Sequence, residues 1–128
     1  MELIDTNIIL RYLVNDDDNF YNKAKNILKE AEIGKRKIQV KVVVIAECCY
    51  VLESFYKKSK EEIASAMEVF LSQRWLKVED RSALLSMWNN FRQNLHFVDC
   101  YLLALAGTNK YKIITFDKEL NKKSEANN

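Results

Sequence analysis

Four acidic residues from distant parts of the chain have positions that could bring them together. Asp5 directly follows an apolar pair at the N-terminus, and Asp117 closely follows another short apolar segment. Glu47 and Asp99 each fall early in a segment with helical periodicity. Because ligands of a parallel sheet bind beyond the carboxyl ends of its strands, we expect these four acids to converge on one rim.

Grouped carboxylates predict a cation. Like charges a few ångströms apart repel and raise one another's pKa values unless a positive charge lies between them. Mg²⁺ and Mn²⁺ are hard ions that prefer such oxygen ligands. A water bound to such an ion can attack a phosphodiester while the metal stabilises charge on the phosphate. The acids therefore predict phosphoryl chemistry with one or two metal ions.

Each acid also has a structural alternative. Asp5 and Asp117 could be helix N-caps, and Asp99 could be a first-turn residue favoured by the helix dipole. Glu47 interrupts the apolar run 42–52, where a lone carboxylate is costly unless it is paired or bound to metal. Glu47 therefore carries the strongest physical argument for a metal site, and periodicity alone leaves both interpretations open.

Short strand patterns alternate with helical patterns along the chain, which is typical of a parallel sheet with helices packed on it. We expect strands near residues 3–4, 38–40, 75–78 and 111–115. We expect helices near residues 8–14, 19–33, 43–56, 59–71, 81–93, 98–108 and 118–122. Ser59 and Glu62 form a capping box at the start of the fourth helix. The third helix is apolar nearly all round, which indicates a buried helix or an interface.

The composition favours one intracellular domain. The chain has 128 residues, and 48% of them are hydrophobic. We therefore expect it to bury a hydrophobic core and to be folded over most of its length. We expect one domain over residues 1–123 and a disordered tail at 124–128. The net charge of +2 does not by itself indicate nucleic-acid binding.

The cysteines and the apolar runs predict the compartment. There are three cysteines, an odd number without zinc-site spacing, so we expect reduced thiols and a reducing cytoplasm. We expect neither a signal peptide nor a membrane span, because no segment shows either pattern.

The acids lie within four ordered motifs. These are Ile4 to Leu13, Val44 to Glu47 followed by Tyr50 to Leu52, Phe97 to Asp99 followed by Leu102 to Ala104, and Ile114 to Lys118. They resemble the motifs of the PIN-domain family, and within it the VapC-type toxins of toxin–antitoxin modules. The resemblance is ordered and spans nearly the whole chain.

The resemblance implies an α/β/α sandwich and a Mg²⁺- or Mn²⁺-dependent endoribonuclease that acts as the toxin of a type II module. It also implies a homodimer and a cognate antitoxin that blocks the site. The implied metal-binding acids are Asp5, Glu47, Asp99 and Asp117, and their polar neighbours are Thr6, Asn7 and Thr115.

Two features depart from the family pattern. His96 stands where such toxins often carry a further aspartate, three residues before Asp99. It could contact phosphate or transfer a proton, although a helix-entry residue is the simpler interpretation. The C-terminus lacks an apolar run after Asp117, so we expect a sheet of about four strands.

RNA also requires cations near the acids, and the candidate RNA-binding residues are Arg11, Lys118 and His96. The chain's aromatic residues are expected mostly in the core, and exposed ones would favour a protein interface.

Two other functions remain open. A catalytically weak or inactive PIN-like dimer could bind RNA or protein without cutting it. A receiver-type α/β domain would also place acids at strand ends. That domain needs a phosphate-accepting aspartate after a central strand, and residues 75–78 lead into Glu79 and Asp80 without the expected apolar context.

Overall fold

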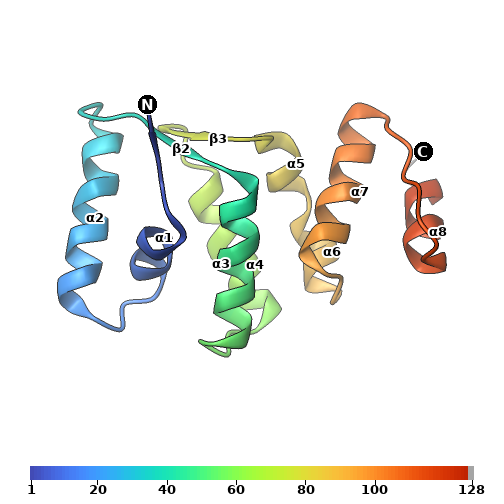
Figure 1. Cartoon of the computed structure of the whole chain (residues 1–128), viewed down its shortest axis with the longest axis horizontal. Helices are drawn as coiled ribbons and strands as arrows, with labels where there is room; N and C mark the ends of the chain where they lie inside the picture. The colour runs from blue at the N-terminus through green and yellow to red at the C-terminus, as the bar shows by residue number, and fades with distance from the viewer. Residues whose placement is uncertain (127–128) are drawn as a thin grey trace. The chain divides into compact units, whose positions relative to one another are not determined.

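The computed structural model describes residues 1–126, which form two compact units, Met1–Glu79 and the chain from Asp80 onward (Figure 1). The first unit contains β1 (Glu2–Leu3), α1 (Thr6–Leu13), α2 (Asp18–Glu32), β2 (Ile38–Val40), α3 (Val42–Ser54), α4 (Lys60–Leu71) and β3 (Leu76–Val78). The second contains α5 (Arg81–Ser86), α6 (Trp88–Arg92), α7 (Phe97–Asn109) and α8 (Lys118–Ala126). The protein is therefore mostly helical, with a short sheet in the first unit.

The three strands form a parallel sheet in the order β1-β2-β3. Its register pairs Ile38 with Leu76 and Val40 with Val78, and all four side chains are buried. Gln39 and Lys77 form the intervening pair, and Lys77 is exposed. This alternation follows from the two-residue period of a strand, which places successive side chains on opposite faces.

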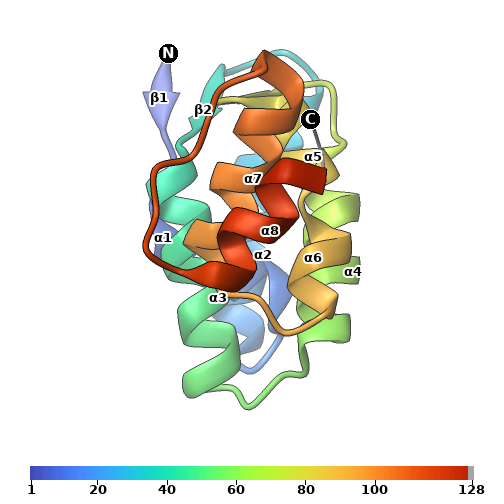
Figure 2. The ribbon, with the colours of Figure 1, turned by 90° about the vertical axis from the view of Figure 1, so that its right-hand side faces the viewer.

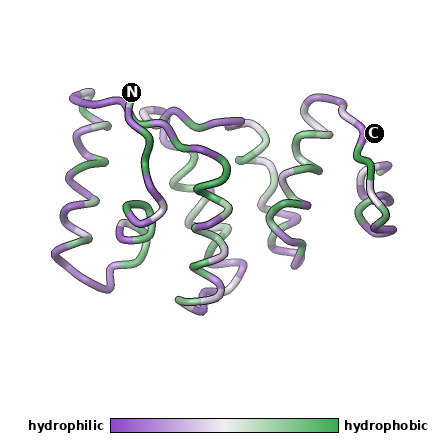
Figure 3. The backbone as a smooth tube through the Cα atoms, in the orientation of Figure 1, coloured by the Kyte–Doolittle hydropathy of each residue, from purple (hydrophilic) through white to green (hydrophobic). Residues whose placement is uncertain are grey.

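Helices α1 to α4 supply most of the first unit's core. Helix α1 packs against both α2 and α3, and α3 packs against α4. Helix α2 is largely hydrophilic, whereas α3 is hydrophobic over most of its length (Figure 3). Ser59 and Glu62 form the expected capping box at the start of α4, with their reciprocal bonds at 3.0 and 3.1 Å.

The second unit is built around α7, which packs against α5, α6 and α8 (Figure 2). Its core includes Leu84, Trp88 and Leu103, each at most 1% exposed. The Trp88 ring meets Phe91 edge-to-face, with centroids 5.4 Å apart. This geometry is one of the arrangements that aromatic pairs prefer.

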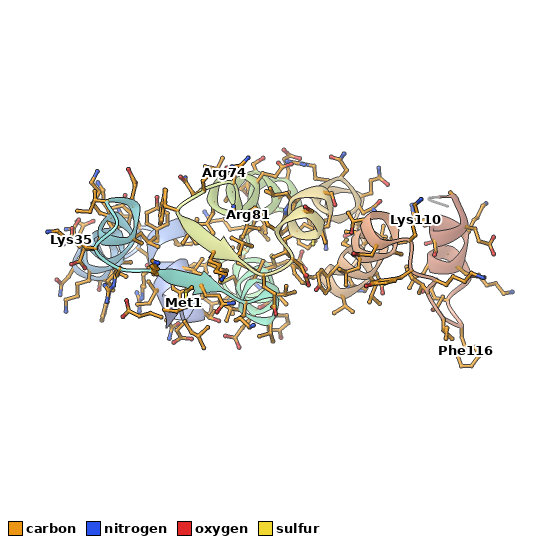
Figure 4. The ribbon with its side chains drawn as sticks, turned by 90° about the horizontal axis from the view of Figure 1, so that it is seen from above. Met1, Lys35, Arg74, Arg81, Lys110 and Phe116 are labelled. Atoms are coloured by element: carbon orange, nitrogen blue, oxygen red, sulfur yellow. The ribbon has the colours of Figure 1, made fainter. Side chains whose placement is uncertain are left out.

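The expectation of a fourth strand at residues 111–115 is wrong. The described residues contain three strands, and this segment is the connection between α7 and α8. Its backbone bonds to local partners, since Tyr111 N donates to Ala106 O and Asp117 N donates to Thr115 Oγ1. Phe116 is fully exposed and its side chain projects away from the ribbon (Figure 4). Apolar composition does not make a strand where no neighbouring strand supplies hydrogen bonds.

Two helical expectations also need correction. The single helix expected at 81–93 is two helices that meet at Met87. Ser86 Oγ donates to Ala83 O at 3.1 Å, a local bond of the kind that competes with helix continuation. The tail expected from Ser124 is helical as far as Ala126 and buries Ser124, while residues 127 and 128 lie outside the described residues.

The cysteines agree with the sequence interpretation. Cys48, Cys49 and Cys100 are free thiols and all three are buried. They therefore pack as small apolar side chains. No helix within residues 1–126 has the length and hydrophobicity required to cross a bilayer.

Candidate metal site

Asp5 lies between β1 and α1 and is the N-cap of that helix. Its Oδ1 accepts a hydrogen bond from Thr6 N at 2.7 Å, which orients the carboxylate. The side chain is exposed, and within residues 1–126 its second oxygen has no hydrogen-bond partner. The capping and metal-binding interpretations are therefore compatible, because the cap uses only one of the two oxygens.

Glu47 lies on the exposed face of α3, so the expectation of a carboxylate inside an apolar environment is wrong. The opposite face of α3 is buried through Ile45, Cys48, Cys49 and Leu52. Apolar residues precede and follow Glu47 in sequence, but they do not all cover it in space. The carboxylate remains open to solvent and hence to a ligand.

Asp5 and Glu47 adjoin a contact between helices α1 and α3. The buried Cys48 thiol donates to Thr6 O across the two helices, at 3.9 Å. Burial, followed by the negative charges of Glu47 and Asp5, raises the pKa of Cys48 to about 12. Both carboxylates therefore lie close enough to this thiol to act on it electrostatically.

Glu79 fixes the start of the helix that carries Glu47. Glu79 Oε1 accepts from Val42 N at 2.9 Å, and its Oε2 lies 3.0 Å from Lys41 Nζ. The bond from Val42 N, followed by the bond from Lys41, lowers the pKa of Glu79. Sequence reasoning missed this contact because it depends on the pairing of Val40 with Val78 across the sheet, which Lys41 and Glu79 directly follow.

Replacing Glu79 with glutamine should destabilise the protein by about 1 kcal/mol at neutral pH, because a partly exposed charged cap and ion pair are lost. The folded pKa of Glu79 is below its ordinary value, so its stabilisation is present above that value and is lost as pH falls. Urea denaturation at neutral and acidic pH tests this. An equal loss of stability at both pH values would contradict it.

The second unit holds the other two acids. Asp99 is half-buried in the first turn of α7. Asp117 directly precedes α8, and its Oδ1 accepts from Leu120 N at 3.0 Å. Thr115 supports it as a polar neighbour, since Thr115 Oγ1 accepts from Asp117 N at 3.0 Å. His96 is the N-cap of α7, exposed and without a side-chain capping bond, as a helix-entry residue would be.

The remaining predicted site residues are placed as follows. Thr6 is buried and Asn7 is exposed in the first turn of α1. Arg11 is already engaged, with Nη1 3.5 Å from Asp16 Oδ1 and Cζ 4.6 Å from the Phe20 ring centroid. Lys118 is exposed at the start of α8.

The donor set fits a hard divalent ion. Asp5 and Glu47 adjoin Thr6 and Cys48, whose backbone oxygen and thiol meet at 3.9 Å. Mg²⁺ commonly takes only one or two carboxylates and keeps several waters. No group of three or more His, Cys, Asp or Glu side chains within metal-binding reach occurs among the described residues. The first unit thus supplies two of the predicted ligands.

Comparison with known proteins identifies the family of the chain. The family model of the PIN domain matches residues 3–126, which include both units and all four acids. Neither the curated proteins nor the solved structures contain a significant match to the chain. The family match covers nearly the whole sequence, and PIN domains are generally nucleases. The chain belongs to the PIN-domain family.

Proposed function

We propose that this protein is a metal-dependent endoribonuclease that hydrolyses RNA phosphodiester bonds. The observation that carries the proposal is that Asp5 and Glu47 adjoin Thr6 and Cys48, which meet across α1 and α3 in a chain that matches the PIN domain over residues 3–126. A nuclease of this kind needs solvent-accessible oxygen ligands, and both side chains are exposed. Asp99 and Asp117 complete the proposed set of acids.

The residues of the first unit have distinct tasks in this proposal. When bound, Mg²⁺ or Mn²⁺ would supply an activated water and stabilise charge on the phosphate. Thr6 N holds one oxygen of Asp5 and leaves the other for the ion. Glu79 fixes the start of α3 and hence the position of Glu47. Preorganised carboxylates of this type need not rearrange when the substrate arrives.

We further propose that the nuclease is the toxin of a type II toxin–antitoxin module, of the VapC type, and that it works in the cytoplasm as a homodimer. The ordered motifs around the four acids support this. Three buried free thiols are compatible with a reducing compartment. A cognate antitoxin would inhibit the enzyme by covering the acids.

A second candidate is a PIN-like dimer that has weak or no catalysis and binds RNA or protein. One observation favours it: His96 occupies a position where related toxins often have an aspartate, so the site has one acid fewer. The four main acids are all present, which favours the nuclease.

Cleavage of a labelled single-stranded RNA tests the main proposal. We expect cleavage with Mg²⁺ or Mn²⁺ and none with EDTA, because the acids need a cation to act on phosphate. Expression should also arrest growth, and the product of a neighbouring gene should relieve the arrest. Cleavage that continues in EDTA would contradict metal dependence, whereas metal-dependent cleavage without growth arrest would contradict only the toxin role.

A further inference from the structure

Helix α3 exposes an aromatic side chain one turn from Glu47. Tyr50 is 72% exposed and lies three residues after that acid. Side chains at this spacing are neighbours on a helix surface, with Cβ atoms about 5–6 Å apart. Helical side chains also lean toward the N-terminus, so the Tyr50 ring lies over the turn that carries Glu47.

The Tyr50 side chain is unconstrained within residues 1–126. Its backbone carbonyl accepts from Ser54 Oγ at 2.7 Å, but its ring and hydroxyl have no hydrogen bond or ring partner in that part of the chain. Val43, 73% exposed, lies on the same side of α3, one turn before Glu47. The acid is therefore flanked on both sides by exposed apolar surface.

A flat aromatic ring, next to a carboxylate that is proposed to act on phosphate, can stack on an unpaired nucleobase. Proteins that bind single-stranded RNA stack its bases on aromatic side chains. A protein partner on this face would also cover Glu47 and block the substrate, as the proposed antitoxin would, so in the active enzyme this face must stay open to RNA. The position of the carboxylate therefore favours RNA over a permanent protein interface.

We propose that Tyr50 is a substrate-binding residue that stacks on a base of single-stranded RNA next to the phosphodiester cleaved at Glu47. The inference rests on the proposed nuclease function and adds a binding contact to the same site. It assigns Tyr50 to substrate affinity and leaves the chemical step to the acids.

Phe55 provides a matched control on the same helix. It is also exposed, at 74%, but it is the C-cap of α3. Eight residues separate it from Glu47, which corresponds to about 12 Å along the helix axis. Its ring meets Tyr56 edge-to-face at 5.0 Å. Removing Phe55 therefore removes an exposed aromatic residue without altering the surface beside Glu47.

The test measures binding of a single-stranded RNA that contains the fluorescent base 2-aminopurine. The Asp5→Asn protein serves as the background, so that the RNA stays intact. We expect Tyr50→Ala to raise Kd by about 5- to 100-fold and to remove the fluorescence quenching caused by stacking. Tyr50→Phe keeps the ring, and Phe55→Ala lies outside the contact, so both should bind like the background protein.

Three results would overturn the inference. Unchanged affinity and quenching in Tyr50→Ala would exclude stacking. Equal losses in Tyr50→Phe and Tyr50→Ala would assign the contact to the hydroxyl group. A change in oligomeric mass with unchanged RNA binding would make Tyr50 a protein interface residue. Cleavage by the unsubstituted protein is assayed separately, so a chain that binds through Tyr50 but never cleaves would refute only the nuclease proposal.

Discussion

Replacing Asp5 with asparagine is expected to lower the rate of metal-dependent RNA cleavage by about 100-fold or more, while the fold is retained. The asparagine side-chain oxygen can still accept the hydrogen bond that Asp5 Oδ1 accepts from Thr6 N. Asparagine and aspartate are comparable N-caps, so helix α1 should keep its stability. The substitution removes the negative charge that the metal needs and leaves the capping bond in place.

Asp17 offers a matched control for this experiment. It is the N-cap of α2, and its Oδ1 accepts from Phe20 N at 3.1 Å. Asp17→Asn makes the same chemical change at a second helix start and should retain full activity. Initial cleavage rates and thermal unfolding of both variants provide the comparison. An active Asp5→Asn enzyme, or an equal loss in Asp17→Asn, would show that the Asp5 carboxylate has no special role.

The sequence predicted the capping roles of Asp5 and Asp117 because such roles depend on local chemistry. Asp5 and Asp117 each accept bonds from backbone N–H groups within three residues, and such caps are visible in the order of residues alone. The first three strands were also predictable, since short apolar segments between helices indicate a parallel sheet.

The environment of Glu47 was not predictable in the same way. A run of apolar neighbours counts residues along the chain, whereas burial depends on which face of the helix meets other elements. In α3 the buried face is Ile45, Cys48, Cys49 and Leu52, and Glu47 lies on the other side. Desolvation therefore does not act strongly on this carboxylate, which is exposed beside the contact between Cys48 and Thr6.

The missing fourth strand has a related cause. Ile113 and Ile114 have the side chains of a strand, but a strand exists only where a neighbour supplies backbone hydrogen bonds. Strand pairing also explains a contact that was not predicted. Glu79 meets Lys41 because of the register of β2 and β3. Register could not be read from sequence before the pairing of the strands was known.

The largest expected effect on stability concerns Cys48 at alkaline pH. Its ordinary pKa is 9.0, and burial together with the charges of Glu47 and Asp5 raises the pKa to about 12 in the folded protein. Between these values the unfolded thiol ionises and the folded thiol does not, so unfolding releases a proton and stability falls as pH rises. Below about pH 9 the full stabilisation is present. About 4 kcal/mol of it is lost when the pH reaches the pKa of the thiol in the folded protein.

Comparison with Cys48→Ala isolates this contribution. The variant should lose about 1 kcal/mol at neutral pH, because a small cavity replaces the sulfur atom. Its stability should then fall much less between neutral and alkaline pH, because no buried thiol remains to titrate at this position. Tyr56, whose pKa is also raised chiefly by burial, contributes equally in both proteins and cancels in the difference.

Urea denaturation from about pH 7 to pH 11 measures how the free energy of unfolding of each protein changes with pH. Above the thiol's ordinary pKa, the slopes of the unsubstituted protein and of Cys48→Ala should differ by about 1.4 kcal/mol per pH unit. The native thiol should also resist iodoacetamide near pH 8 and react after unfolding, because the thiolate is the reacting form. Parallel slopes, or rapid labelling of Cys48 in the folded protein, would mean that the thiol is not held protonated between α1 and α3. The contact between the Cys48 thiol and Thr6 O, which joins the helices that carry Glu47 and Asp5, would then be open to solvent and not buried.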